Sequence, residues 1–341
     1  MNAARFAEIT DRYASLRLAL VGDFCLDRYL EIDPAKAETS IETGLPVHNV
    51  VRVRSQPGGA GTILNNLVAL GIGHISPIGF CGDDGEGYEL QAAMRKLPGV
   101  WAMGFKQTPL RRTFTYCKPL VLHPGQPPVE LNRLDSKNWS PTPALIEGML
   151  VSSLEVRARE LQAVVVLDQV DVPETGVVTK RVLAALGELR RQRPKLPIVG
   201  DSRRGLGGWP PIIFKMNASE LSALTGLPTD AELRQIREAA CALAKQNGSE
   251  VFITLSERGI LGAAPNGEVE HVPCHPLRGP IDIVGAGDAV TANLTAALAA
   301  GATLREAIEL ANAAASIVIH QLGTTGTASV PQIRELLFPR E

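Results

Sequence analysis

Short apolar runs alternate with longer helical patterns along most of the chain. Between the runs, apolar residues recur at spacings of three and four, which is typical of helices that bury one face. This pattern is found in residues 63–71, 178–192, 231–248 and 286–301. The expected strands, rich in Val, Ile and Leu, are residues 16–23, 74–82, 161–168, 196–201, 212–217 and 250–256. The alternation predicts an α/β fold with a mostly parallel central sheet and helices on both of its faces.

Two stretches lack the helical period. Residues 28–55 and 111–133 carry proline, glycine and short β-type runs. We expect them to be strands inserted into the fold, where they form a small β-lid. Because the chain contains no internal repeat or low-complexity linker, residues 1–341 are predicted to be a single domain with this lid.

Composition narrows the class of protein. The chain has 341 residues, 45% of them hydrophobic and 21% charged, which is enough apolar material for one large domain. The formal net charge of -2 favours neither nucleic acid nor an anionic membrane, so small molecules are the expected partners. Five scattered cysteines without a Cys-x-x-Cys pair are typical of reduced thiols, and no apolar run approaches the ~18 residues that span a bilayer. A cytosolic protein is therefore expected.

The stretch DIVGAGDAV, residues 282–290, places an acid where a helical pattern begins. Gly285, Ala286 and Gly287 would expose unpaired backbone N–H groups at the positive end of the helix dipole, which suits a phosphoryl oxyanion. Asp288 would then lie where a hydroxyl nucleophile loses its proton. A tight strand-to-helix turn with a capping acid would contain the same residues. The pattern alone leaves both interpretations open.

Further glycines and acids lie at predicted junctions of strands and helices. Asp27 follows the first strand, where open α/β sheets bind ligands, and its carboxylate could accept two sugar hydroxyls; a solvated loop acid is the alternative. Gly58 and Gly59 precede a helix and would let a ligand approach the backbone. Asn217 and Glu220 stand at a strand end and a helix start. Glu220 could hold a water on Mg²⁺ or complete an N-terminal cap.

Three other motifs are weighed and set aside. No Gly-Lys-Ser/Thr follows residues 285–287, so a Walker loop is excluded, and GLGGW at 205–209 lacks the spacing of a dinucleotide fingerprint. HVPCH at 271–275 offers three soft metal ligands. On a β-type segment these would point to opposite faces, with no evident fourth ligand, so no zinc site is expected.

The order of these pieces resembles the ribokinase-like (PfkB) carbohydrate kinase family over nearly the whole chain. GDFCLDRY (22–29), LNRLD (131–135) and LANAAASIVIHQLGT (310–324) look most like the kinase half of bacterial heptose-phosphate kinase/adenylyltransferases, whose other half has no counterpart in this sequence. The resemblance implies a ribokinase-like three-layer fold. The motifs that carry it are Gly-Asp…Asp (22–27), Gly-Gly (58–59), Asn-x-x-Glu (217–220), Thr-Leu-Ser-Glu-Arg-Gly (254–259), Asp-x-x-Gly-Ala-Gly-Asp (282–288) and Ala-Asn-Ala-Ala-Ala (311–315).

Carried over residue by residue, the resemblance implies an ATP-dependent sugar kinase. Asp288 would be the base, with the backbone of residues 285–287 as the anion hole. Asp27, Gly58 and Gly59 would contact the sugar.

The resemblance also implies how the nucleotide and ions are held. Asn217 and Glu220 would serve the Mg·ATP phosphates, with Glu220 reaching Mg²⁺ through a water. Thr254, Gly259 and Asn312 would line the nucleotide groove.

A monovalent cation and a dimer are implied as well. Backbone carbonyls of Asp282 and Val284, with the loop near Gly323, match where family members hold K⁺. The lid often forms the dimer contact in this family, so a homodimer is a further expectation.

The sequence departs from the family at three places. Val284 replaces the usual Thr, which changes little if only its carbonyl binds the cation. Thr62, a predicted substrate contact, stands where the family usually places an Asn that reaches sugar hydroxyls. Residues 167–176, LDQVDVPETG, replace the Asp-Tyr-x-x-Gly segment of the heptose kinases. The last two departures concern the acceptor, whereas the phosphoryl-transfer residues match the family.

The predicted reaction moves the γ-phosphoryl group of ATP to a hydroxyl of a sugar or sugar phosphate, with heptose 7-phosphate as the first candidate. Because the transition state is loose, an ordinary carboxylate pKa near 4 would suffice for Asp288. Arg203 or Arg204 would supply the charge that a Walker lysine supplies elsewhere. Arg133, ahead of Arg112 and Lys118, would bind a phosphate already on the substrate.

Two alternatives stay open from the sequence. The first is a sugar- or nucleotide-binding protein that has kept the fold and lost catalysis, which Thr62 and the altered segment 167–176 favour. The second is a nucleoside kinase, against which the aromatic content of 4% argues mildly, because a base-stacking pocket needs aromatic rings.

Overall fold

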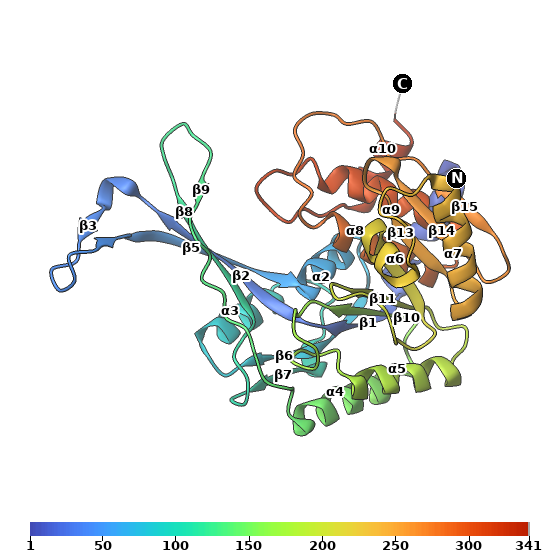
Figure 1. The fold of residues 1–341 in the computed structure, drawn as a ribbon, viewed down its shortest axis with the longest axis horizontal. Helices are drawn as coiled ribbons and strands as arrows, with labels where there is room; N and C mark the ends of the chain where they lie inside the picture. The colour runs from blue at the N-terminus through green and yellow to red at the C-terminus, as the bar shows by residue number, and fades with distance from the viewer. Residues whose placement is uncertain (340–341) are drawn as a thin grey trace.

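A computed structural model describes residues 1–339; Arg340 and Glu341, the last two residues of the predicted domain, lie outside the described part. The nine strands of its central sheet are β1 (Arg17–Gly22), β6 (His74–Gly82), β7 (Phe105–Thr108), β10 (Ala163–Asp168), β11 (Ile198–Ser202), β12 (Ile213–Asn217), β13 (Val251–Thr254), β14 (Ile260–Ala263) and β15 (Val269–Val272). Their order is β15-β14-β13-β12-β11-β10-β1-β6-β7, parallel from β13 to β7 and antiparallel at β13–β14 and β14–β15 (Figure 1). All six predicted strands lie in this sheet.

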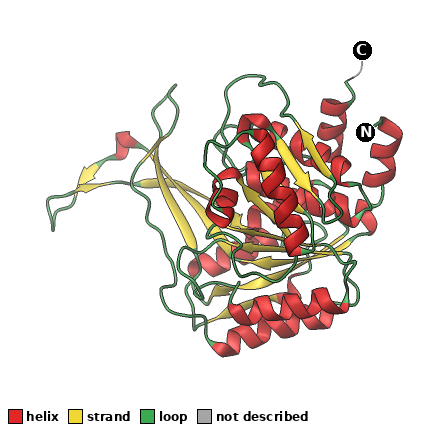
Figure 2. Ribbon diagram, turned by 45° about the vertical axis from the view of Figure 1, so that its right-hand side comes forward, coloured by secondary structure: helices red, strands yellow, loops and turns green. Residues whose placement is uncertain are grey.

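Helices cover both faces of the sheet (Figure 2). On one face lie α1 (Ala3–Thr10), α2 (Ala60–Ala69), α3 (Gly85–Met94), α8 (Ala286–Ala299), α9 (Leu304–Val318) and α10 (Val330–Leu337). On the other lie α4 (Ala144–Arg157), α5 (Lys180–Gln192), α6 (Ala218–Thr225) and α7 (Leu233–Asn247). The 3₁₀ helices are Tyr13–Ser15, Pro34–Lys36, Ala102–Gly104 and Ser256–Arg258. Within residues 1–339 we find no helix with both the length and the apolar character to cross a membrane.

The central strands bury both of their faces. In β1, Leu18 and Leu20 pack into one hydrophobic core, whereas Ala19 and Val21 pack into the other. Because side chains alternate along a strand, continuous apolar runs are what a doubly covered parallel strand requires. The sheet therefore separates two cores, as the apolar runs predict.

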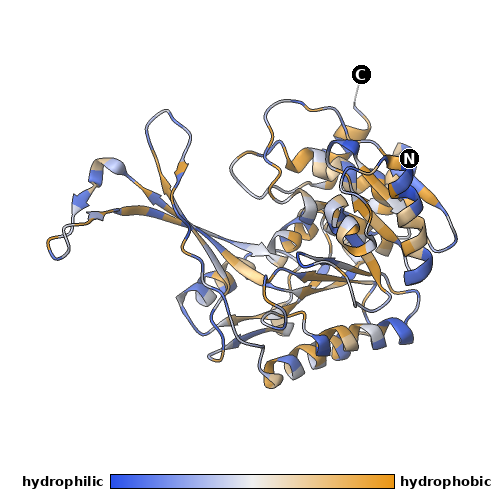
Figure 3. Ribbon diagram, in the orientation of Figure 1, coloured by the Kyte–Doolittle hydropathy of each residue, from blue (hydrophilic) through white to orange (hydrophobic). Residues whose placement is uncertain are grey.

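A second sheet extends from the body of the molecule (Figures 1 and 3). It has the order β5-β2-β8-β9 and consists of β2 (Phe24–Ile32), β5 (Val50–Gly59), β8 (Thr115–Val121) and β9 (Val129–Glu130); β3 (Glu38–Thr39) and β4 (Pro46–Val47) pair beside it. These strands come from the two segments that the sequence assigns to a lid, 28–55 and 111–133, although β2 begins at Phe24 and β5 runs on to Gly59. That the sheet closes over a substrate stays a prediction.

The topology fixes where a ligand can bind. From β1 the chain moves to β6 on one side and later returns to β10 on the other side of β1. At such a switch point the loops after the strands diverge and leave a crevice at their carboxyl ends. Asp23 follows β1, Asp168 ends β10, and α8 packs against β10 and β11. Asp288, in the first turn of α8, is thereby placed near this edge of the sheet.

Candidate active site

The start of α8 is shaped by a glycine. Gly285 has a φ of 84°, in the left-handed region that side chains disfavour, and α8 begins at the next residue. A methyl group on Gly285 would lie 3.6 Å from Cγ2 of Thr62 and 3.5 Å from Cβ of Thr325. No side-chain hydrogen bond caps this helix in the described structure. The Ala286 N–H donates to the Ile283 carbonyl at 3.2 Å, so the next N–H groups, those of Gly287 and Asp288, are the ones available to an anion. Asp288 lies half-buried in the first turn.

The pKa of Asp288 differs from the expected ordinary value near 4. Burial, and then the negative charge of Asp201, raise the pKa of Asp288 to about 7. Asp27 adds to this rise, whereas Lys215 and Arg203 oppose it. The pKa of Asp288 is therefore not the ordinary value near 4, because desolvation and the neighbouring carboxylates outweigh the two cations. A carboxyl group that titrates near neutral pH is well matched to accept a proton there.

A buried ion pair that was not predicted from the sequence lies under the start of α8. Lys215 Nζ lies 2.7 Å from Asp201 Oδ2, and Thr291 Oγ1 donates to the same oxygen at 2.9 Å. Lys215 and Asp201 are 6% and 7% exposed. The signal was a lysine inside the apolar strand IIFKMN, since lysine is almost never buried unless it is paired.

The Asp27 carboxylate of β2 lies against Gly58 of β5, which is paired with Cys25 in the sheet. A methyl group on Gly58 would lie 2.5 Å from Asp27 Oδ2, so this contact requires a glycine. Gly59, with a φ of 57°, precedes α2, and a methyl group there would lie 2.5 Å from the Asp23 carbonyl oxygen. Burial raises the pKa of Asp27, against the charges of Lys118 and Arg133. The predicted sugar-binding residues on these two strands are thus brought together, and Asp27 is buried, not a solvated loop acid.

Tyr116 contacts the guanidinium groups of both Arg133 and Arg203. The Arg133 guanidinium lies 4.8 Å from the centre of the Tyr116 ring and binds Asp135 at 2.6 Å. Arg203 donates to the Tyr116 hydroxyl at 3.1 Å, so it lies beside the second sheet and not among the residues that line the nucleotide groove. Arg204 instead binds buried Asp168 at 2.7 Å.

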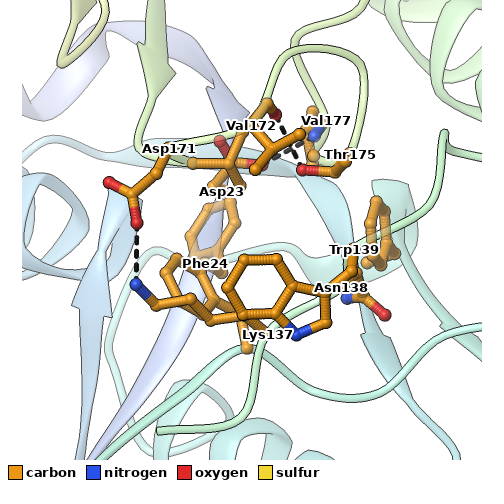
Figure 4. A pocket seen from close by; sticks show the side chains of 13 residues that line it. Asp23, Phe24, Lys137, Asn138, Trp139, Asp171, Val172, Thr175 and Val177 are labelled. Atoms are coloured by element: carbon orange, nitrogen blue, oxygen red, sulfur yellow. Dashed lines mark hydrogen bonds and ion pairs between the residues drawn. The ribbon is translucent and has the colours of Figure 1, made fainter.

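Asp23 holds the segment 167–176, which departs from the family pattern, through two hydrogen bonds. The Asp23 carboxylate accepts the N–H of Gln169 at 2.8 Å and that of Val177, just after the segment, at 2.6 Å. Next to it lies a cavity of about 30 Å³. Figure 4 shows the ion pair between Lys137 and Asp171 along one side of this cavity, with the rings of Phe24 and Trp139 facing it. The altered segment therefore lines this cavity, next to the loop that follows β1.

A groove on the other side of α8 has the size of a nucleotide site. Its volume is about 560 Å³, within the range of small-molecule pockets. Three predicted nucleotide residues, Thr254, Gly259 and Asn312, line it together with Ala286 and Gly287. The groove therefore reaches the start of α8.

Two of these groove residues hold its walls in place. Asn312 Nδ2 donates to the Pro273 carbonyl at 2.6 Å and fixes the loop over the groove. Gly259 has a φ of 90°, and a methyl group there would overlap the Val272 carbonyl oxygen. Both residues thus shape the groove through backbone contacts.

Asn217 and Glu220 form a capping box at the start of α6. The Glu220 N–H donates to Asn217 Oδ1 at 2.9 Å, and the Asn217 N–H donates to Glu220 Oε2 at 2.8 Å. The capping interpretation therefore holds, and it does not exclude contact with a hydrated ion through the other carboxylate oxygen. Burial and the charge of Asp201 raise the pKa of Glu220, while Lys215 opposes the rise, which places Glu220 in the field of the buried pair.

The residues predicted for ions lie in separate places. The Asp282 carboxylate accepts the Val284 N–H at 3.0 Å and the Gly323 N–H at 3.4 Å, so the two loops predicted to hold a monovalent cation are adjacent. In HVPCH, the strand ends at Val272, and Cys274 Sγ donates to the Glu257 carbonyl at 2.8 Å. Across residues 1–339 there is no group of three or more His, Cys, Asp or Glu side chains placed to hold a metal ion.

Related sequences and structures agree with this architecture. The chain is 32% identical over 330 residues to the bifunctional protein HldE of Rhodospirillum rubrum, covering 95% of this chain and 62% of that protein. It is 30% identical over 310 residues to HldE of Azorhizobium caulinodans, covering 90% and 61%. The chain thus spans about three fifths of the length of these relatives.

Solved structures share the fold at low sequence identity. Arabidopsis thaliana ribokinase, complexed with ribose and ATP, aligns with a TM-score of 0.66 at 19% identity, covering 95% of this chain and 99% of that one. Escherichia coli phosphofructokinase-2, in complex with potassium, aligns with a TM-score of 0.68 at 19% identity, covering 94% and 97%. The three-layer ribokinase-like fold is therefore confirmed.

The family model described as "pfkB family carbohydrate kinase" matches residues 24–331, nearly the whole chain. Phosphoryl transfer to a hydroxyl acceptor is the class of reaction of such kinases. The chain belongs to the pfkB family of carbohydrate kinases.

Proposed function

We propose that this protein transfers the γ-phosphoryl group of ATP to a hydroxyl of a sugar or sugar phosphate, with Asp288 as the base. The observation that carries the proposal is the position of Asp288. It directly follows Gly287, which lines the groove of nucleotide size, and Gly285 at the start of the same helix lies beside Thr62 of the predicted acceptor site. The charge of Asp27 also raises the pKa of Asp288, so the two carboxylates share one electrostatic environment.

The proposed step balances as an in-line displacement. The acceptor oxygen forms a bond to the γ-phosphorus while the bond from phosphorus to the β–γ bridging oxygen breaks, and that electron pair leaves with ADP. Asp288 takes the hydroxyl proton. The N–H groups of Gly285 and Gly287, which have no backbone partner in the described structure, would face the equatorial oxygens of the transferred group.

Mg²⁺ would be held mainly by the ATP phosphates and water, as is usual for this ion, and would neutralise phosphate charge. The carboxylate and amide oxygens of Glu220 and Asn217 are the kind of groups that hold such an ion through its waters. K⁺ at the loops of Asp282, Val284 and Gly323 is proposed on the adjacency of these loops. Replacing K⁺ by a larger organic cation should then lower the rate; an unchanged rate would remove this site.

We propose a phosphorylated acceptor, with heptose 7-phosphate as the first candidate. The charges of Lys118 and Arg133 both oppose the rise in the pKa of Asp27, the carboxylate that would hold the sugar hydroxyls. Arg133→Ala should weaken discrimination between a sugar phosphate and the plain sugar. Arg54→Ala is the matched control, because Arg54 also stacks on a lid tyrosine, Tyr29 at 4.8 Å, yet binds Glu31. Equal loss in both variants would contradict the assignment.

The exposed apolar side chains of the second sheet support a homodimer. Val50, Val51, Val53 and Val129 are between 43% and 50% exposed, and an unpaired edge strand needs covering. We propose a dimer through this sheet, and light scattering of wild type and Val51→Lys would test it. A monomeric wild type would refute the dimer.

The cytosolic location stays a prediction.

The first experiment is ADP release from Mg·ATP with a panel of sugars and sugar phosphates that includes heptose 7-phosphate. Activity with one acceptor class in wild type, lost in Asp288→Asn and kept in the surface control Glu238→Gln, supports the proposal. Tight nucleotide binding without turnover on any acceptor would favour the alternative of a binding protein. Turnover confined to nucleosides would favour a nucleoside kinase.

A further inference from the structure

A buried ammonium group lies under the loop that begins α8. Lys215 comes from β12 and Asp201 from β11, and they form their ion pair at 2.7 Å between these strands and α8. Lys215 is 6% exposed, so this charged residue is almost completely removed from water. Thr291 of α8 donates to the same carboxylate oxygen and stands 3.0 Å from the Gly287 carbonyl oxygen. The pair is therefore connected to the helix that carries Asp288.

The ammonium points toward the proposed anion hole. Lys215 Nζ lies 3.2 Å from the place where a Cβ on Gly287 would be. An ammonium group has three N–H donors, and Asp201 is its one hydrogen-bond partner among the protein groups of residues 1–339. Asp288 and Glu220, on two further elements, both act on it electrostatically. A buried cation with spare donors beside an exposed helix start is suited to a multiply charged anion.

We propose that Lys215 is a further catalytic residue, whose ammonium contacts the transferred phosphoryl group, and that Asp201 and Thr291 are positioning residues that aim it. This inference rests on the proposed kinase function. It assigns the role of the absent Walker lysine to Lys215, a residue of the central sheet. Arg203 and Arg204, which were predicted for this role, instead bind Tyr116 and Asp168. Lys215 keeps its protons throughout the step, while the hydroxyl proton goes to Asp288.

A purely structural ion pair is the competing explanation, and a double variant separates the two. Lys215→Met alone leaves a buried, unpaired carboxylate, which is strongly destabilising and uninformative about catalysis. Lys215→Met combined with Asp201→Asn removes both charges at nearly constant volume, and such replacements of buried pairs are often tolerated. If the pair only holds the fold, the double variant recovers normal activity.

The experiment measures transfer and nucleotide binding in wild type and in the double variant. We expect kcat to fall about 10²- to 10³-fold, as when a donor to a developing oxyanion is removed, with ADP affinity unchanged. The affinity for a non-hydrolysable ATP analogue should fall about tenfold or more, because a charge-assisted hydrogen bond to the γ-phosphate is lost. Normal kcat and normal affinity for both nucleotides in a folded double variant would overturn the inference.

The two readouts also separate this inference from the kinase proposal. Wild type could transfer to no acceptor while the double variant loses affinity for the ATP analogue but not for ADP. In that case the kinase proposal fails and the contact of Lys215 with the γ-phosphate stands. If wild type transfers normally and the double variant matches it, only the role of Lys215 fails. Arg203→Met serves as a control for loss of one nearby cation, since Arg203 also acts on Asp288 but lies outside the groove. It should leave the contrast between ADP and the ATP analogue unchanged.

Discussion

The proposed nucleotide side and the proposed acceptor side of the crevice are built in different ways. On the nucleotide side, main-chain geometry dominates: Gly259 and Gly285 have positive φ angles, and the N–H groups of Gly287 and Asp288 at the start of α8 have no backbone partner in the described structure. On the acceptor side, side chains dominate: Asp27 is flanked by Lys118 and Arg133. A site built from backbone tolerates few substitutions, whereas a site built from side chains can change with the substrate. The departures from the family pattern lie mainly on the acceptor side.

The largest expected effect on the rate comes from replacing Asp288, the proposed base between the two sides. Asp288→Asn should lower kcat by about 10²- to 10⁴-fold and leave ATP binding nearly intact, because a base is lost while the groove is kept. The variant should also be more stable than wild type near pH 8. Since the folded-state pKa of Asp288 is raised to about 7, ionisation of this group destabilises the fold as pH rises from about 4 through 7.

Stability near pH 3, about one unit below the ordinary pKa, is the control for this claim, because there the group is largely protonated in both states. There the thermal unfolding midpoints of wild type and Asp288→Asn should agree. Full turnover in the variant would break the assignment of the base, whatever the stability result.

A second substitution should affect the acceptor side alone. Gly58→Ala would press a methyl group against Asp27 Oδ2, from which it would stand 2.5 Å away, and should displace that carboxylate. We expect kcat/KM for the acceptor to fall about 10²-fold while the KM for ATP is unchanged. Gly85→Ala is the matched control, because a methyl group there meets open space. Equal changes in the KM values of both substrates would show that the two sides are not separable.

The pH dependence tests the electrostatics that join the two sides. Asp288 faces Asp201, Asp27, Lys215 and Arg203, and its pKa is raised to about 7. Because the base must be ionised, kcat/KM should rise with pH and level off above about 7, losing about tenfold for each pH unit below. Arg203→Met removes an exposed cation that lowers the pKa of Asp288, so it should move the midpoint to higher pH. An unmoved midpoint would show that Arg203 does not act on the base.

The smallest expected effect is on acceptor preference. Thr62→Asn restores the side chain that the family usually has, beside Gly285. We expect a change of about tenfold or less in the ratio of kcat/KM values between two acceptors, with no change for ATP. Thr108→Asn, at another buried threonine on β7, is the control for simply enlarging a buried side chain. An identical acceptor ratio in wild type and Thr62→Asn would remove Thr62 from the acceptor site.

The fold was predictable because its signals are local. Apolar runs such as residues 161–168 mark strands that are buried on both faces, and capping and spacing mark the helices. Strands β7, β14 and β15 were missed, since they are short, and β7 and β15 are only partly buried, so they lack continuous apolar runs. The extent of the second sheet beyond Arg28 and Ser55 depends on pairing between distant segments, which periodicity does not report.

The site was predictable only in part, for a related reason. The glycine-rich turn before Asp288 is a short contiguous motif, so its position on a helix start could be read from the sequence. The raised pKa of Asp288 and the pair of Lys215 with Asp201 arise where three elements meet, and no local spacing encodes that meeting. The lysine in an apolar strand was the one available signal.

The most direct test of the central claim follows the labelled γ-phosphoryl group of ATP into product, with wild type and Asp288→Asn in parallel and heptose 7-phosphate among the acceptors. The account predicts that wild type moves the label to a sugar hydroxyl, with little release to water, and that Asp288→Asn does so at least about 10²-fold more slowly. Label that stays on ATP with every acceptor, or that passes to sugar equally fast in both proteins, would contradict it.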